Sequence, residues 1–179
     1  MTDDVMTGEL KELRARVARL EAKEACVSTF NEYLHYLDGD KPEELLGVFA
    51  PDAVLDVIDF PPGTGNDLHF VGRDEIRPLY AGHRGGAGRH HSANVTVNVE
   101  DDSAELSSYF ATSGPYGWGG GLYQMTLRPE PGAGKWLIGR MRIVSTWGWL
   151  LKSDEPAYLG SPLGKGALRD GRPVVYRMS

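Results

Sequence analysis

The stretch that decides the fold is LKELRARVARLEAKEACVSTFNEYLHYLD, residues 10–38, which is followed by Gly39. Apolar side chains recur in it at steps of three, four or seven residues, the pattern of one apolar stripe on a helix. The stripe consists of Leu10, Leu13, Val17, Leu20, Val27, Phe30, Leu34 and Leu37. Glycine enters the left-handed conformation after a helix without steric penalty, so we expect Gly39 to end this helix. The stretch therefore predicts one continuous core helix with a polar, ionisable end.

Asp38 stands at the carbonyl end of this predicted helix. That end carries partial negative charge, which disfavours a second anion, so another interaction must favour the carboxylate there. An ordinary Asp-Gly turn is one explanation and a functional carboxylate is the other. These residues alone leave both explanations open.

Length and composition bound the domain organisation. A chain of 179 residues is long enough for one domain with a full core and too short for two of typical size. We expect residues 1–9 to be a flexible N-terminus and residues 10–150 to form the domain. Residues 151–179 are rich in Pro and Gly, and we expect them to form a tail that packs on the domain or on a partner subunit.

Charge and cysteine content exclude several classes of function. The net charge of -6 and the absence of a Lys/Arg cluster argue against binding to nucleic acid or an anionic membrane. No run approaches the roughly 18 apolar residues of a membrane span. Cys26 is the single cysteine, so the chain has no internal disulfide and gives no sign of an oxidising compartment. We therefore expect a soluble, cytoplasmic protein.

Strand patterns dominate the second half of the chain. Before them, we expect short helices at 42–49 and 72–80 and short strands at 53–57 and 68–71. The long predicted strands are 90–99, 104–112, 121–128 and 135–149. Their turn spacings require consecutive antiparallel hairpins. The sequence predicts an α+β domain with three helices on one face of a strongly curved antiparallel sheet, and bulges in the long strands would supply the curvature.

His90 and His91 open the first long strand. Neighbouring strand residues face opposite ways, so only one of the two can point at the ligand side unless a bulge intervenes. Alternation groups His91 with Val95 and Val97, which nominates His91 if the valine side faces the helices. A surface or hydrogen-bonded histidine remains the alternative for either residue.

Other chemistries lack support in the sequence. There is no His-x-His or Cys-x-x-Cys motif and the carboxylates are dispersed, so we predict no metal and no cofactor. The small-residue contexts around Gly139 and Ser145 contain no nucleophile elbow. What remains is proton transfer by a histidine near a carboxylate, in a pocket lined by Tyr, Trp and Phe.

The order of several motifs resembles the SnoaL-like family of the NTF2-like superfamily. They are Tyr-x-x-Tyr-Leu-Asp (33–38), Phe-Ala-Pro-Asp-Ala (49–53), Gly-Arg-Asp-Glu-Ile (72–76), His-His-Ser-Ala-Asn (90–94) and Gly-Lys-Trp-Leu-Ile-Gly-Arg (134–140). The resemblance covers roughly residues 13–149 and implies a cone-shaped scaffold with helices inside a curved sheet. This scaffold hosts dehydratases, isomerases, dehydrochlorinases, cyclases, epoxide hydrolases and proteins with no known catalysis.

The resemblance also implies site residues. Dehydratases and dehydrochlorinases of the superfamily use an Asp-His dyad, whose members match Asp38 and His90. A bulge near Ser92 would reconcile His90 with an inward valine side, and His91 remains the second choice. A Trp-x-x-x-Arg spacing in the last strand matches Arg140, and a tyrosine near the family aspartate matches Tyr33.

These observations together predict a cofactor-independent lyase or isomerase that acts on a small, mostly apolar, cyclic metabolite. The alternative is a non-catalytic protein that uses the same cone to hold a ligand or a partner subunit. The residues that we expect to contact substrate are Tyr36, Phe49, Asn94, Tyr123 and Trp147. We also expect a homo-oligomer, most simply a dimer through the outer face of the sheet, where Phe110, Trp147 and Trp149 would be costly to expose.

Overall fold

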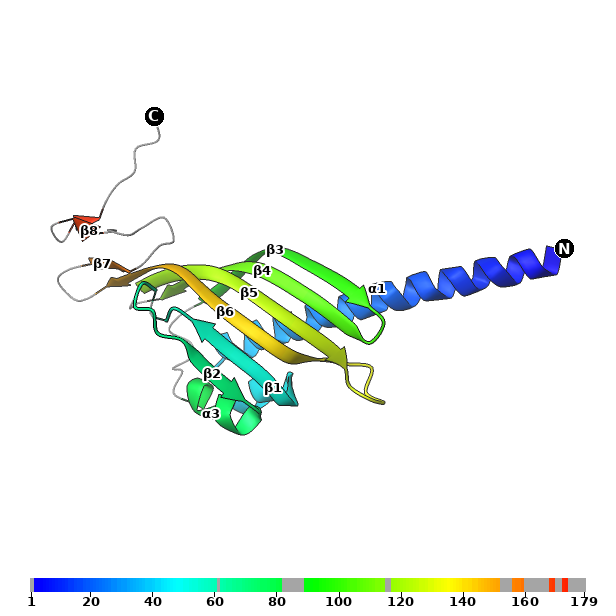
Figure 1. Cartoon of the computed structure of the whole chain (residues 1–179), viewed down its shortest axis with the longest axis horizontal. Helices are drawn as coiled ribbons and strands as arrows, with labels where there is room; N and C mark the ends of the chain where they lie inside the picture. Colours follow the sequence, from blue (N-terminus) through cyan, green and yellow to red (C-terminus); the bar gives the residue numbers. More distant parts are fainter. Residues whose placement is uncertain are drawn as a thin grey trace, which may run out of the picture.

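The computed structural model describes residues 2–60, 62–81, 89–114, 117–151, 156–159, 168–169 and 172–173. Within these ranges, a long helix and two short helices pack with a seven-stranded sheet, and a separate two-stranded pair follows (Figure 1). The elements are α1 (Thr2–Asp38), α2 (Pro42–Gly47), β1 (Phe49–Ile58), β2 (Leu68–Val71), α3 (Arg73–Ala81), β3 (Arg89–Glu100), β4 (Ser103–Gly114), β5 (Gly117–Pro129), β6 (Trp136–Leu151), β7 (Pro156–Leu159), β8 (Leu168–Arg169) and β9 (Arg172–Pro173). The predicted α+β fold, with helices packed in a curved sheet, is confirmed.

The strand order of the main sheet is β2-β1-β6-β5-β4-β3, with β7 also pairing with β6. The meander from β3 to β6 is antiparallel, as the turn spacings predicted. β1 and β6 are parallel, with Val54 opposite Arg140, so the prediction of a purely antiparallel sheet was wrong at this pair. β1 also starts at Phe49, and α2 therefore ends at Gly47 rather than at the predicted residue 49.

A β-bulge interrupts β3 where it pairs with β4. Ala93 lies opposite Tyr109 and Thr96 opposite Ser107, so Asn94 and Val95 share the place opposite one residue of β4. Asn94 has a φ of 55°, in the left-handed region that Asn tolerates better than most residues. The extra residue reverses the alternation of the strand, so that His90 and Val97 face the same side of the sheet.

The long helix differs from its prediction at both ends. α1 begins at Thr2, so most of the stretch predicted as a flexible N-terminus is helical. Leu10 and Leu20 are 52% and 66% exposed, so the apolar stripe of the sequence does not lie on the core as one surface. At the other end, Asp40 and not Gly39 has the positive φ, at 54°. Gly39 is needed for space, because a Cβ there would lie 2.9 Å from the carbonyl oxygen of His35.

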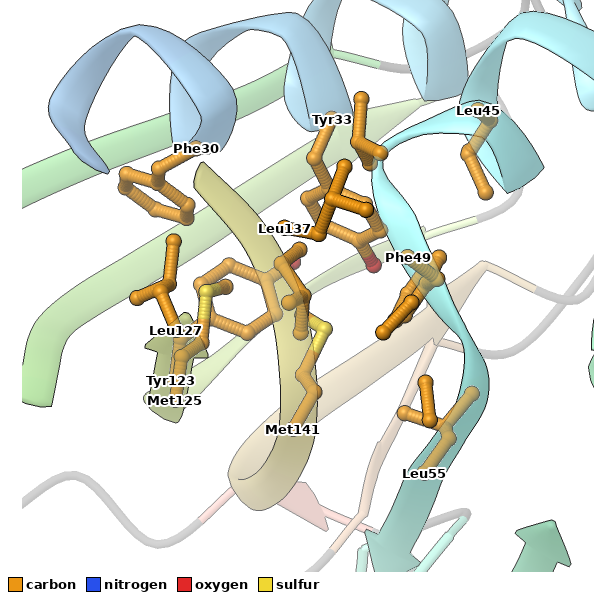
Figure 2. Packing of buried hydrophobic residues seen from close by; sticks show 14 of the residues in the cluster. Phe30, Tyr33, Leu45, Phe49, Leu55, Tyr123, Met125, Leu127, Leu137 and Met141 are labelled. Atoms are coloured by element: carbon orange, nitrogen blue, oxygen red, sulfur yellow. The ribbon is translucent and has the colours of Figure 1, made fainter. Parts of the chain in front are cut away.

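The core lies between the C-terminal half of α1 and the inner face of the sheet (Figure 2). Phe30 and Tyr33 of α1 meet Tyr123 of β5, with ring centroids 5.7 and 6.0 Å apart. Phe110 stacks on Tyr123 at 4.4 Å. Phe110 therefore faces the core, and its predicted place on an outer association surface was wrong.

Part of the predicted tail returns to the sheet, since β7 pairs with the end of β6, with Trp149 opposite Tyr158. Most of residues 151–179 lie outside the described residues. No helix in the described part of the chain is long and apolar enough to cross a membrane.

Candidate functional site

Asp38 is the last residue of α1 and His90 is the second residue of β3, and their side chains meet. Asp38 Oδ1 lies 2.6 Å from Nδ1 of His90. The backbone N–H of His90 also donates to both carboxylate oxygens, at 3.2 and 3.1 Å. These donors explain why a carboxylate is stable at the negative end of a helix. The His90 and Asp38 side chains are only 13% and 18% exposed, so the pair lies largely out of the solvent.

The geometry fixes which ring nitrogen of His90 carries the proton. A carboxylate only accepts hydrogen bonds, so Nδ1–H donates to Asp38, and the lone pair of the neutral ring is on Nε2. An imidazole held in this way can take a proton at Nε2, and the carboxylate then stabilises the imidazolium that forms. Within the described residues, no three His, Cys, Asp or Glu side chains gather as metal ligands.

A cluster of buried tyrosines lies beside the pair. The hydroxyls of Tyr33 and Tyr80 are 3.1 Å apart, and that of Tyr123 also interacts with Tyr33. Burial raises the pKa of the Tyr33 and Tyr123 phenols well above the ordinary value, and the charge of Asp38 adds to both increases. Burial raises the pKa of Tyr80 as well. The three phenols therefore stay protonated and form a neutral hydroxyl network next to the carboxylate.

Tyr80 adjoins the candidate site, and it was predicted only as the last residue of the helix at 72–80. It comes from α3, and its ring packs on Phe49 with centroids 6.2 Å apart. The hydroxyl of a tyrosine on an apolar helix face needs a hydrogen-bond partner when it is buried. This requirement could have identified Tyr80 from the sequence as a residue with a polar contact.

Of the residues predicted to contact substrate, Tyr123 belongs to the tyrosine cluster and Phe49 packs on it. Phe49 is fully buried and meets Tyr33 at 6.0 Å between ring centroids. Tyr36 is partly buried and packs against the core from the last turn of α1. Thr112 of β4, the cross-strand partner of His90, faces the same side as the histidine. Aromatic and small polar side chains thus adjoin the Asp38–His90 pair.

His91 and Trp147 lie on the outer face of the sheet, away from His90. The cross-strand row that contains His91 runs through Ala111 and Gly120 to Trp147. Paired residues of a sheet face the same side, and this row is next to the one that contains His90. The indole of Trp147 covers Gly120, where a Cβ would meet it at 2.6 Å. The structure therefore does not bring His91 or Trp147 to the site, and simple strand parity failed because of the bulge.

Arg140 also points to the outer face, where it forms an ion pair with Asp56. Its Nη2 and Nε lie 2.7 and 3.2 Å from Asp56 Oδ2, and His69 Nδ1 lies 2.7 Å from Asp56 Oδ1. Burial opposes ionisation of Asp56, but the hydrogen bonds from His69 and Arg140 outweigh it and hold the pKa of this carboxyl below its ordinary value. The structure therefore does not bring Arg140 to the Asp38–His90 pair, because its position on β6 directs it to the face opposite His90.

Asn94 is exposed and forms the bulge described above. Its backbone conformation gives it a structural role, since it sets the side of the sheet to which His90 points. The structure does not bring its side chain to the Asp38–His90 pair.

The fold, a long helix packed against a curved sheet, is shared with solved structures of other α+β proteins. An NTF2-like protein with a cystatin-like fold from Novosphingobium aromaticivorans shares 22% identity, with 81% of this chain and 92% of the other covered at a TM-score of 0.61. The chain belongs to the SnoaL-like family, whose domain model matches residues 18–142. The resemblance noted in the sequence is thereby confirmed.

Two further solved structures share the fold. A putative scytalone dehydratase from Novosphingobium aromaticivorans is 23% identical, with 93% of this chain and 99% of the other covered and a TM-score of 0.57. A hexachlorocyclohexane dehydrochlorinase (LinA type 3) from Novosphingobium barchaimii is 16% identical, with 80% and 94% covered and a TM-score of 0.59. The chain has no match among curated protein sequences.

Proposed function

We propose that this protein is a cofactor-independent lyase or isomerase that uses Asp38 and His90 as an acid/base pair on a small, mostly apolar, cyclic metabolite. The observation that carries the proposal is the 2.6 Å contact between Asp38 Oδ1 and His90 Nδ1 in a largely buried setting. Names of two structural relatives, a dehydratase and a dehydrochlorinase, describe eliminations and support the same reaction class. Such eliminations begin with loss of a proton from carbon, which a base of this kind can accept.

The proposed reaction starts with His90 Nε2 removing a proton from a carbon next to an activating group. The imidazolium keeps its Nδ1–H bond to Asp38, so the carboxylate stabilises the charge that forms. In an elimination, the electron pair of the C–H bond forms the double bond and a hydroxide or halide leaves. The proton on Nε2 then joins a departing hydroxide as water, or is released to solvent as a halide departs. In an isomerisation, the same proton returns to another carbon of the substrate.

The surrounding tyrosines support this chemistry by positioning. Tyr33 is 1% exposed and its hydroxyl is paired with Tyr80, so it holds the end of α1 in place beside Asp38. Phe49 and Tyr123 pack on Tyr33 in the core, and these apolar surroundings support the proposal of a substrate with little polar surface. Tyr33 is therefore a positioning residue in this proposal.

Proton exchange tests the proposal without knowledge of the natural substrate. A panel of cyclic ketones and halogenated cyclohexanes is first screened for binding by thermal shift. Binders are then incubated in D₂O, and NMR follows exchange of the α-proton of a ketone or formation of the alkene from a halide. We expect His90→Ala and Asp38→Asn each to lower the rate by roughly 100-fold or more. The double variant should cost little beyond the worse single change, because the two residues act as a unit.

His91→Ala is the matched control, since it removes the neighbouring histidine from the other face of the strand. Its rate should stay within about twofold of the unmodified protein. Equal rates for the unmodified protein and His90→Ala on a compound that both bind would refute the catalytic proposal. The chain would then be a ligand-binding member of its family.

A further inference from the structure

The N-terminal half of α1 carries apolar side chains that its own domain leaves in solvent. Figure 1 shows this half of the helix extending past the edge of the sheet. The exposed residues, with their exposed fractions, are Met6 (59%), Leu10 (52%), Leu13 (55%), Val17 (45%) and Leu20 (66%). We call these five residues the N-terminal seam. Side chains of this size, exposed in a row, are characteristic of a surface that binds another protein segment.

The seam lies on the side of α1 opposite to the face that packs on the sheet. At about 100° per residue, the five seam residues point about 150° away from the core-facing Cys26, Phe30 and Tyr33. The sheet side of the same part of α1 carries Ala15, Ala18 and Ala22, which border a hollow of about 950 Å³ next to the β3–β4 turn. The seam therefore cannot fold onto its own sheet while α1 remains one helix.

The spacing of the seam identifies the partner. Its residues follow each other at steps of four, three, four and three, which is the heptad repeat of a coiled coil. In heptad positions, Leu10 and Val17 occupy a, and Met6, Leu13 and Leu20 occupy d. We propose that the N-terminal seam of α1 pairs with the same seam of a second copy of this chain as a parallel coiled coil.

The charges beside the seam fit a parallel pair. In that arrangement, each g residue faces the e residue of the next heptad on the other helix. Glu9 at g would meet Arg14 of the second copy, and Arg16 at g would meet Glu21. All four side chains are exposed beside the seam. In an antiparallel pair, e faces e and g faces g. In either antiparallel register that overlaps four seam residues, Arg14 would meet Thr7 or Arg14 of the second copy, so only the parallel pair gives Arg14 a carboxylate partner.

Pairing of this kind leaves the candidate site accessible. α1 is a continuous helix from Thr2 to Asp38, and at 1.5 Å per residue Leu20 lies about 27 Å along it from Asp38. The contact surface is also separate from the outer face of the sheet, so it does not depend on any association there. The isolated seam is short, but each copy already holds it as a helix that continues into a folded core, which reduces the ordering cost of pairing.

Cysteine cross-linking tests both the contact and its direction. Cys26 is the single cysteine of the chain, so Cys26→Ala provides a thiol-free background whose fold is checked by circular dichroism. In that background, Leu13→Cys places a thiol at d, which faces its own copy in a parallel in-register pair. Diamide oxidation at micromolar protein should give a covalent dimer. Glu12→Cys, one residue away on the outward side, is the matched control and should remain monomeric on a denaturing gel.

Charge reversal tests the pairing without the cysteine background. Sedimentation equilibrium on the full chain should show a dimer dissociation constant raised roughly 10-fold by Arg16→Glu and restored by adding Glu21→Arg. Leu13→Glu should raise it by at least about 100-fold. Equal cross-linking at positions 12 and 13, no cross-linking at position 13, or dissociation constants unchanged by Leu13→Glu would each overturn the proposal.

Discussion

Removal of single hydroxyls from the buried tyrosine network should destabilise the protein in a pattern set by its connectivity. Tyr33 is 1% exposed and Tyr80 is 5% exposed, with 3.1 Å between their hydroxyl oxygens. Tyr80→Phe removes one partner of Tyr33, so we expect a loss of about 1 kcal/mol in the free energy of unfolding. Tyr33→Phe removes a partner from both Tyr80 and Tyr123, so we expect about 2 to 3 kcal/mol. For a domain of this size, each 1 kcal/mol corresponds to roughly 2–4 °C in Tm.

The double variant Tyr33→Phe/Tyr80→Phe distinguishes a network from two independent effects. It should cost little more than Tyr33→Phe alone, because the hydroxyl of Tyr80 has lost its partner already when Tyr33 is changed. Urea unfolding followed by circular dichroism gives the four free energies of the cycle. Tyr109→Phe, which alters a 58% exposed tyrosine, is the control and should be neutral. Additive losses, or no loss for Tyr33→Phe, would refute the hydrogen-bonded network.

The same network predicts a fall in stability at alkaline pH. Burial raises the pKa values of its phenols above the ordinary 10.0, so the fold favours the protonated form. The resulting stabilisation is complete below pH 10 and is lost as the pH rises towards the folded-state values. Unfolding free energies measured between pH 8 and pH 11 should fall less steeply in Tyr33→Phe/Tyr80→Phe than in the unmodified protein.

Three further changes test the sheet. Gly121→Ala should lower the free energy of unfolding in urea by about 3 kcal/mol or more, because its Cβ would lie 1.9 Å from the carbonyl oxygen of Val144. Gly47→Ala is the control and should be neutral or stabilising, because no atom lies within 4 Å of the added Cβ. Asn94→Ala should lower the free energy of unfolding by about 1 kcal/mol and Asn94→Gly by only a few tenths, since glycine accepts the positive φ. Loss of ligand binding in Asn94→Gly would instead mean that the side-chain amide of Asn94 contacts the ligand. Asp56→Asn should cost about 1 kcal/mol at pH 7 and progressively less as the pH falls below 3.8. A carboxyl with a lowered pKa stabilises the fold fully above its ordinary 3.8 and loses that effect as the pH falls towards the lower folded-state value. A cost that does not change between pH 7 and pH 2.5 would contradict this.

The fold class could be predicted because its signals are local. Turns and strand patterns between residues 90 and 149 specify antiparallel hairpins one after another. The parallel pairing of β1 with β6 joins residues such as Val54 and Arg140, which no turn connects. A pairing between strands so far apart in the chain produces no pattern within one short stretch of sequence, so the parallel pair was not predicted.

The stripe on α1 was misinterpreted because two apolar faces follow each other on one helix. Leu13 and Leu20 repeat every seven residues, whereas Phe30, Tyr33 and Leu37 face the sheet at a different angle. The signal for the change was the run of alanines on the sheet side, at positions 15, 18, 22 and 25, where the helix faces a hollow. Spacing alone joined the two faces into one.

The site could be predicted in part. The position of Asp38 at an unfavourable helix end was a physical signal, and the motif resemblance selected His90 over His91. Strand alternation placed His91, rather than His90, on the same side as the valines, because the bulge at Asn94 lies between the two histidines and the valines that were used as the reference. Arg140 was selected by motif spacing alone, which does not specify the face of β6 to which a side chain points.

β1 cannot complete its pairing until the last long strand of the sheet has been synthesised. β1 can pair with β2 early, as a hairpin, but its other edge can pair only once β6 is present. The N–H of Ile138 in β6 also donates to the carbonyl of Val48 at 2.9 Å. Contacts between residues so far apart in the chain form slowly, and an open strand edge can pair with another chain in the meantime. The nascent protein is therefore exposed to aggregation along β1 during translation, and the ribosome must release β6 before the sheet can close.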